Sequence, residues 1–531
     1  MNNLFLKSQA SFASPVFKGI AYLLVLSSEL AFCAHLPKAI RIECVFSLMA
    51  KILSFQDSLA GSLNANTRLD IASLSAAESW FADSLNVTSE SYGLLTDLYQ
   101  LTMAACYTGE GLQQKQASFE LFTRRLPEGY GYLIAMGLEQ ALEYLEQIRF
   151  TSEQILQLQQ TNIFSHAPDN FWGLLADFRF EGDVWAVPEG TAIFANEPML
   201  RVEAPLWQAQ LVETYLLNTL NYQSLIGTRA ARLRQAAGPE AKLYEFGTRR
   251  AFSPQGALWA ARSAIAGGLD ATSNVLAALK LEQQPVGTMA HALVMAVAAL
   301  EGSEEDSFAA FHRYFPGAPL LIDTYDTVAA ARKLGEKVNA GMSLKGVRID
   351  SGNLAEDAKA VRSHLPEIPI FASGDLDEYA IEKLRQEQAC IDGYGLGTKL
   401  VTGAPVNGVY KLVEIDGKPV MKESSEKLTY PGRKQIFRRY QDNQIVSDRL
   451  ALQIEAASDD EIPLLQRVVK AGVRLAPAEP VGESLQKIAQ RTAQTVEQLP
   501  DSVKTLRSPT PLCVQISRGL ERLTQSTQKS A

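Results

Sequence analysis

The second half of the chain repeats a short apolar run, a polar tip and an amphipathic helix. The apolar runs are 320–322, 347–349, 368–371 and 391–394. Helical spacing of apolar residues follows the first three, at 328–338, 355–365 and 378–387. Strands that alternate with helices predict parallel strands joined by right-handed crossovers. We therefore expect an α/β fold with an irregular (β/α) barrel domain.

The polar residues stand where each apolar run ends. In a barrel of parallel strands those ends form one face, and that face carries the chemistry. Residues far apart in the sequence are therefore expected to converge on one cleft.

The flanking segments follow other patterns. Residues 206–237 have helical spacing, and Gly238-Pro239 stops the helix. Residues 182–202 have the pattern of strands and turns, and 409–421 that of a hairpin with Asp416-Gly417 as its turn. We expect both flanks to build a second, α+β sandwich-like domain. The predicted divisions are an extension outside the fold (1–90), an N-terminal α+β domain (91–205) and the catalytic barrel (206–404). A C-terminal segment (405–531) is expected to return in part to the N-terminal domain. The last 15 residues are polar and are expected to fray.

Composition excludes some classes of protein. The 531 residues are 47% hydrophobic and carry a net charge of −9, so the basic footprint of a nucleic-acid binder is absent. Five scattered cysteines without a CxxC pair predict buried reduced thiols rather than disulfides or zinc ligands. Residues 17–34 are mostly apolar but contain Lys18 and Glu29, and the clean run 20–26 is too short to span a bilayer. We expect an appended or misassigned leader and a cytoplasmic protein without a membrane anchor; a cleaved signal or an anchor is the alternative.

Two glycine-containing motifs could bind phosphate. Gly395-Leu396-Gly397-Thr398 follows an apolar run, and glycines let backbone N–H groups approach an anion while Thr398 adds a hydroxyl. A structural turn would explain the same residues. Arg249 and Arg250 follow Gly247 after another short apolar run, which suits bidentate anion capture as well as a solvated surface pair.

Three further residues stand out at or near the expected strand ends. Arg348 and Asp350 flank Ile349, so both point to one face of a strand. They could form a simple ion pair, or Arg348 could hold an anion while Asp350 holds ribose hydroxyls or magnesium. His291 closely follows a Gly-Thr step, although a lone histidine is more often structural than catalytic. The chain has no Walker-type phosphate loop.

With these motifs the chain resembles the nicotinate phosphoribosyltransferase family over most of 92–523. The blocks that carry the resemblance stand in order along the sequence: 95–103 (LTDLYQLTM), 119–127 (FELFTRRLP), 245–250 (EFGTRR), 267–274 (GGLDATSN), 287–291 (GTMAH), 323–327 (DTYDT), 348–354 (RIDSGNL), 395–398 (GLGT), 408–412 (GVYKL) and 431–434 (PGRK). Residues 1–90 have no counterpart in the family pattern, and Asn353 stands where many relatives have Asp.

The resemblance implies that nicotinate and phosphoribosyl pyrophosphate give nicotinate mononucleotide and diphosphate, with Mg²⁺ present and with coupled hydrolysis of ATP. It implies that ATP phosphorylates His291. It also implies a homodimer with shared active sites, to which Tyr99 comes from the neighbouring subunit.

Further roles are carried over by motif. The resemblance implies that Tyr99 and Thr288 would contact nicotinate, that Arg348 would hold its carboxylate or a nearby phosphate, and that Gly395, Gly397 and Thr398 would hold the ribose 5-phosphate. It also implies that Arg249 would meet phosphate and that Asp350 would meet the ribose hydroxyls or magnesium-bound groups.

Three alternatives stay open. A nicotinamide-using relative carries an aspartate where this chain has Ser273, and an aspartate would repel a carboxylate substrate. A catalytically inactive binding relative would keep the fold without turnover. An aldolase-like barrel enzyme would need a Schiff-base lysine, for which Lys399 is the one nearby candidate.

Overall fold

The computed structural model describes residues 85–422, 429–475 and 483–530. Contacts divide the chain into Met1–Asn86 and Val87–Ala531, and every element below lies in the second unit. The predicted extension 1–90, with its apolar stretch, falls almost entirely outside the described residues. Within the described residues, none of the helices is both long and apolar enough to cross a membrane.

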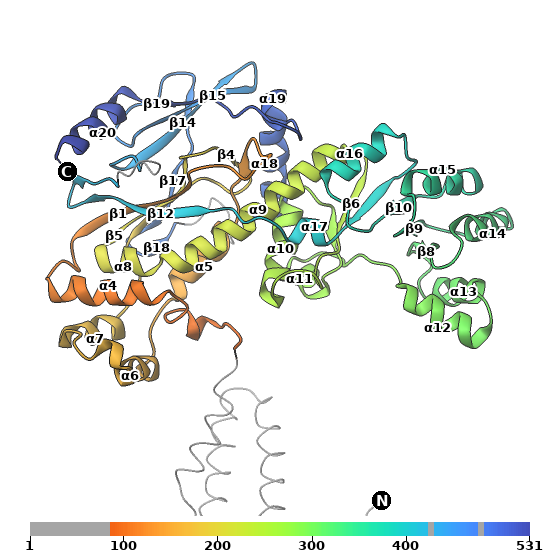
Figure 1. The fold of residues 1–531 in the computed structure, drawn as a ribbon, viewed down its shortest axis with the longest axis horizontal. Helices are drawn as coiled ribbons and strands as arrows, with labels where there is room; N and C mark the ends of the chain where they lie inside the picture. Colours follow the sequence, from red (N-terminus) through yellow and green to blue (C-terminus); the bar gives the residue numbers. More distant parts are fainter. Residues whose placement is uncertain (1–84, 423–428, 476–482, 531) are drawn as a thin grey trace, which may run out of the picture. The chain divides into compact units, whose positions relative to one another are not determined.

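A seven-stranded sheet combines segments from both ends of the second unit (Figure 1). Its order is β13-β12-β1-β5-β3-β17-β18, and every recorded pairing in it is antiparallel. The strands are β1 Gln116–Thr123, β3 Asp183–Ala186, β5 Pro198–Pro205, β12 Gly408–Ile415, β13 Lys418–Pro419, β17 Gln466–Lys470 and β18 Val473–Arg474. The expected hairpin is confirmed, because Asp416 and Gly417 turn between β12 and β13 with φ of 46° and 72°.

A four-stranded sheet, β16-β14-β15-β19, contacts the larger sheet. Its strands are β14 Lys434–Gln441, β15 Gln444–Leu452, β16 Glu461–Pro463 and β19 Val514–Ile516. The buried Lys434 on β14 lies 2.8 Å from the buried carboxylate of Glu120 on β1. An α+β domain built from both flanks is therefore present, as the sequence predicts.

Helices complete this domain and cover its apolar core. They are α4 Leu98–Gly109, α5 Leu138–Gln147, α6 Ser152–Gln160, α7 Asp169–Ala176 and α8 Leu206–Leu211, and the short pair β2 Leu133–Ile134 with β4 Ala192–Ile193 lies among them. Tyr144 of α5 stacks on Tyr215 with ring centroids 4.0 Å apart. Such stacked pairs add to the apolar area that drives folding.

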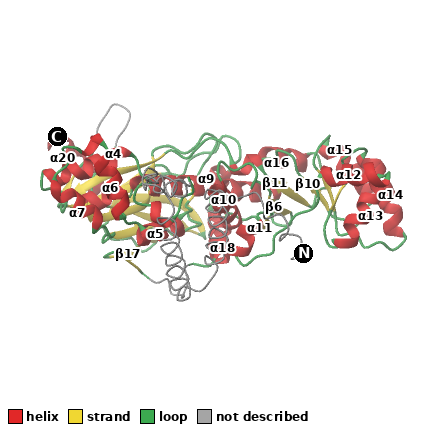
Figure 2. Ribbon diagram, turned by 90° about the horizontal axis from the view of Figure 1, so that it is seen from below, coloured by secondary structure: helices red, strands yellow, loops and turns green. Residues whose placement is uncertain are grey.

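A parallel sheet has six strands in the order β7-β6-β11-β10-β9-β8, and all its recorded pairings are parallel. The strands are β6 Lys242–Glu245, β7 Ala271–Thr272, β8 Leu320–Leu321, β9 Val347–Ile349, β10 Ile370–Ala372 and β11 Gly393–Leu396. The helices are α10 Pro254–Ala266, α11 Val275–Lys280, α12 His291–Glu301, α13 Glu304–Tyr314, α14 Thr327–Asn339, α15 Leu354–His364, α16 Glu378–Gln386 and α17 Thr398–Val401. In Figure 2 the helices α12, α13, α14 and α15 lie together at the right of the view. The predicted alternation of strand and helix is confirmed, with β7 and β8 as the edge strands of the sheet.

The long helix α9, Glu213–Ala237, contacts elements of both domains. Ser224 and Thr228 accept hydrogen bonds from the backbone N–H groups of Met136 and Ile134, on the side of the antiparallel sheet. On the other side Arg232, fully buried, pairs with Glu378 of α16 at 2.9 Å. The helix ends at Gly238, whose φ of 85° suits the predicted stop.

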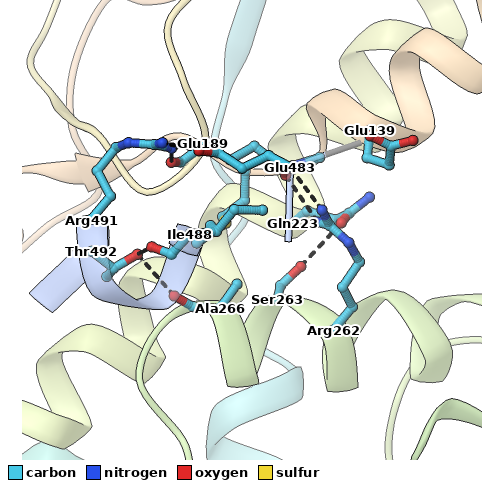
Figure 3. Close-up of polar contacts among 12 residues, drawn as sticks. Glu139, Glu189, Gln223, Arg262, Ser263, Ala266, Glu483, Ile488, Arg491 and Thr492 are labelled. Atoms are coloured by element: carbon cyan, nitrogen blue, oxygen red, sulfur yellow. Dashed lines mark hydrogen bonds and ion pairs between the residues drawn. The ribbon is translucent and has the colours of Figure 1, made fainter. Parts of the chain in front are cut away.

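Helix α18, Leu485–Gln498, fastens the domain of the antiparallel sheet to α10, as Figure 3 shows. Thr492 donates to the carbonyl of Ala266 at 2.8 Å. Arg262 of α10 makes two hydrogen bonds, 2.9 and 2.7 Å, to the carboxylate of Glu189. Burial disfavours the charged form of Glu189, but Arg262 and the backbone N–H groups of Gly137 and Leu138 together lower the pKa of this carboxyl.

Four expectations from the sequence are wrong in detail. The helix predicted for 206–237 is broken at Val212 into α8 and α9. The last strand is displaced along the chain, so Gly395 lies inside β11 rather than in the loop after it. The C-terminal residues form a helix, α20 Arg518–Ser530, with Leu520 buried in the core, where fraying was expected. Cys106 and Cys513 are free thiols but exposed rather than buried.

The pair of Arg232 and Glu378 provides a test of the α9 packing. Arg232→Met should destabilise the fold by about 3–5 kcal/mol, because it leaves a buried carboxylate without its cation. The double variant Arg232→Met with Glu378→Leu should recover most of this loss. The measurement is the urea midpoint of each variant, and equal midpoints for the single and the double variant would contradict the expectation.

Candidate active site

The carboxyl ends of the parallel strands meet at one edge of the six-stranded sheet. Strands β6, β9, β10 and β11 end at Glu245, Ile349, Ala372 and Leu396, and the motifs singled out in the sequence lie at or just beyond these positions. In open and closed sheets of this type, ligands bind outside this edge.

Arg348 is the residue that connects most of this edge. Its Nη1 donates to Asp350 Oδ1 and to Ser373 Oγ, both at 2.9 Å, and its Nη2 donates to the carbonyl of Met289 at 2.9 Å. Ser373 also donates to Asp350. Burial lowers the pKa of the Arg348 guanidinium. Among the described residues its Nε is buried and has no hydrogen-bond partner, so the two Nη groups make all the recorded hydrogen bonds of this side chain.

The ion pair that the spacing of Arg348 and Asp350 allowed is therefore present. The pair does not bury the Asp350 carboxylate, because the Asp350 side chain is still 35% exposed. Both groups contact Ser373, which follows β10, so the end of β9 is joined to the end of β10 with a carboxylate and a guanidinium at the same edge.

His291 is the first residue of α12, and its ring lies beside the loop after β8. Nδ1 is 3.0 Å from Thr324 Oγ1, and Nε2 is 3.9 Å from Asp323 Oδ1. The imidazole is 38% exposed, whereas the Asp323 side chain is 2% exposed. An accessible imidazole held by a buried carboxylate and a hydroxyl can exchange a proton or a phosphoryl group with a ligand.

Asp323 also ties His291 to the Arg348 cluster. Its Oδ2 accepts from the backbone N–H of Asp350 at 2.9 Å and from Ser351 Oγ at 2.7 Å. Its Oδ1 has no hydrogen-bond partner among the described residues. The loops after β8 and β9 are thus held together by one carboxylate.

The glycines allow close packing at the ends of β10 and β11. A Cβ on Gly395 would lie 2.6 Å from the ring of Phe246, and one on Gly374 would lie 2.3 Å from the carbonyl oxygen of Asp350. Gly374 also has a φ of 100°, which a side chain disfavours. At Gly397 an added Cβ would meet only ordinary contacts, and Thr398 begins α17 directly after it.

Three further predicted residues lie close to this edge but make fewer recorded contacts than Arg348: Arg249, Ser273 and Thr288. Arg249 is exposed, and its charge contributes to the lowered pKa of Arg348, whose main cause is burial. Ser273 follows β7, and its backbone N–H donates to the carbonyl of Glu245 at 2.9 Å. Thr288 is half-buried, one residue before Met289, whose carbonyl accepts from Arg348.

Tyr99 is the one predicted site residue on a different domain. It lies on α4 and is 46% exposed. Burial of part of the ring and the negative charge of Glu213 raise the pKa of its hydroxyl to about 12. No hydrogen bond or ring contact recorded for the described residues joins Tyr99 to His291, Arg348 or Asp350.

Three residues of the cluster had no assigned role in the sequence, namely Asp323, Ser373 and Glu245. The signal that could have found Asp323 and Ser373 is the same strand-end position that marks Asp350. Lys399 pairs with Asp377 at 3.1 Å on the exposed side of α17, which gives no support to a Schiff-base role.

A cavity within the described residues lies away from this edge. It has a volume of about 710 Å³, and aromatic side chains including Tyr92, Tyr222, Phe252 and Trp259 line it. None of the predicted site residues lines it. Within the described residues, no group of three His, Cys, Asp or Glu side chains is arranged to hold a metal ion.

Comparison with known proteins agrees with this geometry. Family models match residues 94–221, as the N-terminal domain of nicotinate phosphoribosyltransferase, and residues 241–446, as the nicotinate phosphoribosyltransferase family. A nicotinate phosphoribosyltransferase of Mycobacterium tuberculosis is 39% identical over 424 residues, 78% of this chain and 89% of the relative. That of Bacillus subtilis is 41% identical over 399 residues, 70% and 78%.

A solved structure is similar over the same region. The human nicotinic acid phosphoribosyltransferase matches with a TM-score of 0.70 and 30% identity, covering 81% of this chain and 99% of the human one. The family models and these relatives show that the chain belongs to the nicotinate phosphoribosyltransferase family.

Proposed function

We propose that this protein joins nicotinate to the phosphoribosyl group of phosphoribosyl pyrophosphate, in a reaction coupled to hydrolysis of ATP through a phosphorylated His291. The observation that carries the proposal is the connection of His291, Asp323, Asp350 and Arg348 at one edge of the parallel sheet. The family to which the chain belongs supports the two substrates.

In this reaction the pyridine nitrogen forms a bond to C1 of the ribose, and the bond from C1 to the diphosphate oxygen breaks. The transition state separates a cationic sugar from an anionic leaving group. Catalysis then rests on position and charge rather than on a covalent nucleophile. The edge supplies cationic side chains, Arg249 and Arg348, together with the carboxylate of Asp350.

Each group has a proposed partner. Arg249 meets phosphate and Arg348 meets the nicotinate carboxylate or a nearby phosphate, since guanidinium groups bind such anions in a planar, directed manner. Thr398, with the backbone at Gly395 and Gly397, holds the ribose 5-phosphate. Asp350 accepts from the ribose hydroxyls.

Magnesium fits this site as an ion shared with the substrate. Mg²⁺ takes few protein ligands when phosphates are present, and the partly exposed carboxylate of Asp350 offers oxygen of the right kind. When bound, the ion would neutralise charge on the leaving diphosphate. The chain's own residues position that diphosphate beside Arg249.

The proposed phosphorylation transfers the γ-phosphoryl group of ATP to the imidazole, forming a P–N bond as the bond to ADP breaks. Thr324 and Asp323 hold the ring in place while it stays accessible. The lack of a Walker-type loop agrees with ATP using the same anion-binding edge.

Nicotinate is favoured over nicotinamide by the residue at position 273. A serine carries no charge, whereas an aspartate there would repel the substrate carboxylate. Ser273 follows Thr272 at the carboxyl end of β7, and Arg348 lies next to the carboxyl end of β9 in the same parallel sheet.

A homodimer with shared sites accounts for the position of Tyr99. Its exposed ring lies on α4 with two other exposed apolar residues nearby, Leu95 and Leu98. A second set of exposed apolar side chains lies before α10 and along α11: Phe252, Val275, Leu276 and Leu279. Apolar surface of this kind marks protein contact sites, and we propose that Tyr99 reaches the strand-end cluster of the partner subunit.

The role of His291 is testable by substitution. In His291→Ala, ATP should no longer raise the rate of mononucleotide formation, and the protein should not retain label from [γ-³²P]ATP. The exposed His166 gives a matched control, and His166→Ala should keep both properties. Label retained by His291→Ala would contradict the proposal.

The choice of pyridine is tested at Ser273. We expect Ser273→Asp to raise the KM for nicotinate about tenfold, because like charges repel in a partly desolvated site. Asparagine has nearly the same size as aspartate but carries no charge, so Ser273→Asn should change this KM far less. Wild-type turnover of nicotinamide with none of nicotinate would refute the substrate assignment.

Shared sites predict complementation between inactive subunits. Mixing Tyr99→Ala chains with His291→Ala chains should restore about a quarter of the wild-type ATP-dependent rate, since half of randomly paired dimers hold one intact site of two. The rate is measured after co-expression or reversible dissociation. A mixture no more active than its components would exclude Tyr99 from a shared site.

A further inference from the structure

Glu245 is a buried carboxylate at the edge of the candidate site. It is the last residue of β6, its side chain is 0% exposed, and no ion pair to Lys or Arg is recorded for it within the described ranges. Burial raises the pKa of this carboxyl. A buried acid without a cation is costly, and a smaller neutral residue would avoid that cost.

The two oxygens of Glu245 hold two different loops. Oε1 accepts from the backbone N–H of Gly247, which starts the turn that presents Arg249. Oε2 accepts from the hydroxyl of Thr272 at the end of β7. The carboxylate therefore joins the loop before α10 to the loop before α11.

Further hydrogen bonds extend this hold over three consecutive residues. Thr272 Oγ1 accepts from the backbone N–H of Asn274 at 2.9 Å, and Ser273 N–H donates to the carbonyl of Glu245 at 2.9 Å. On the other loop, the N–H groups of Arg250 and Ala251 donate to the carbonyl of Gly247 at 2.7 and 3.0 Å. The backbone on either side of Ser273 and Arg249 is thus fixed by the Glu245 carboxylate together with these neighbouring bonds.

We propose that Glu245 is a positioning residue that sets the Arg249 loop and the Ser273 loop at a fixed separation, and thereby determines the affinity for both substrates at once. The inference rests on the proposed function, in which Arg249 meets the phosphates and Ser273 faces the pyridine. Glu245 itself touches neither substrate.

The test uses Thr272, because its hydroxyl is the replaceable half of the contact. Thr272→Val removes the hydroxyl and keeps the shape, while Thr272→Ser keeps the hydroxyl. The dissociation constants for phosphoribosyl pyrophosphate and for nicotinate are measured by calorimetry on the full chain, with KM and kcat alongside. Loss of a hydrogen bond to a charged group should raise both dissociation constants about tenfold in Thr272→Val, and Thr272→Ser should stay close to wild type.

Glu245→Gln tests the same contact from the other side. It should raise both dissociation constants, and adding Thr272→Val to it should cause little further loss, because the two changes remove one shared interaction. Glu197→Gln is the matched control. Glu197 is equally buried and accepts from a backbone N–H, that of Phe194, but belongs to the other domain. It should lower the melting temperature without changing either dissociation constant.

The outcomes separate this inference from the proposed function. If Thr272→Val lowers only the melting temperature, or if Thr272→Ser binds as weakly as Thr272→Val, the positioning role is wrong. A wild-type chain that binds both substrates without forming mononucleotide would refute the proposed function, while the variants would still decide on Glu245. A wild-type chain that binds neither substrate overturns both.

Discussion

Helix α9 has to satisfy polar partners in two domains at once, and the rest of the described fold depends on this constraint. Ser224 and Thr228 bind the backbone beside β2, and Arg232 pairs with Glu378 of α16. Farther along, Arg234 donates to the carbonyl of Gly268 at 2.9 Å, just before β7. Apolar contacts alone would let a helix slide or rotate, whereas unsatisfied buried polar groups are penalised strongly. The start of α16 and the segment that leads into β7 are therefore held against α9 by directional bonds.

The part of the fold that the sequence predicts well depends on local pattern. The apolar runs before Asp323, Asp350 and Ser373 are strands, because each run is short and a polar tip ends it. The part that it predicts poorly depends on distant contacts. Gly395 reads as a loop residue, yet it lies inside β11 because only a residue without a side chain fits against Phe246. The polar C-terminus forms a helix because Leu520 finds a core contributed by residues far away in the chain.

The candidate site divides in the same way. Residue type and strand-end position single out Arg348 and Asp350 without any structure, and the family resemblance singles out His291. Neither reveals that Asp323 connects His291 to Asp350, and through Asp350 to Arg348, since an aspartate after a strand is common and its contacts come from separate segments. Tyr99 shows the complementary limit, because the role proposed for it in a partner subunit has no local pattern that would connect it to the cluster.

The geometry around Arg348 also explains why a guanidinium is required there. Two of its nitrogens already hold Asp350, Ser373 and the carbonyl of Met289, so the side chain cannot swing toward a ligand. Its Nε is buried and has no hydrogen-bond partner among the described residues, so what the side chain contributes is a positive charge fixed in position. A lysine at this position could neutralise charge, but its single nitrogen lacks the planar, forked geometry with which the guanidinium holds three loop groups. The ion pair with Asp350, which taken alone would suggest a purely structural residue, thus helps to hold that charge in place.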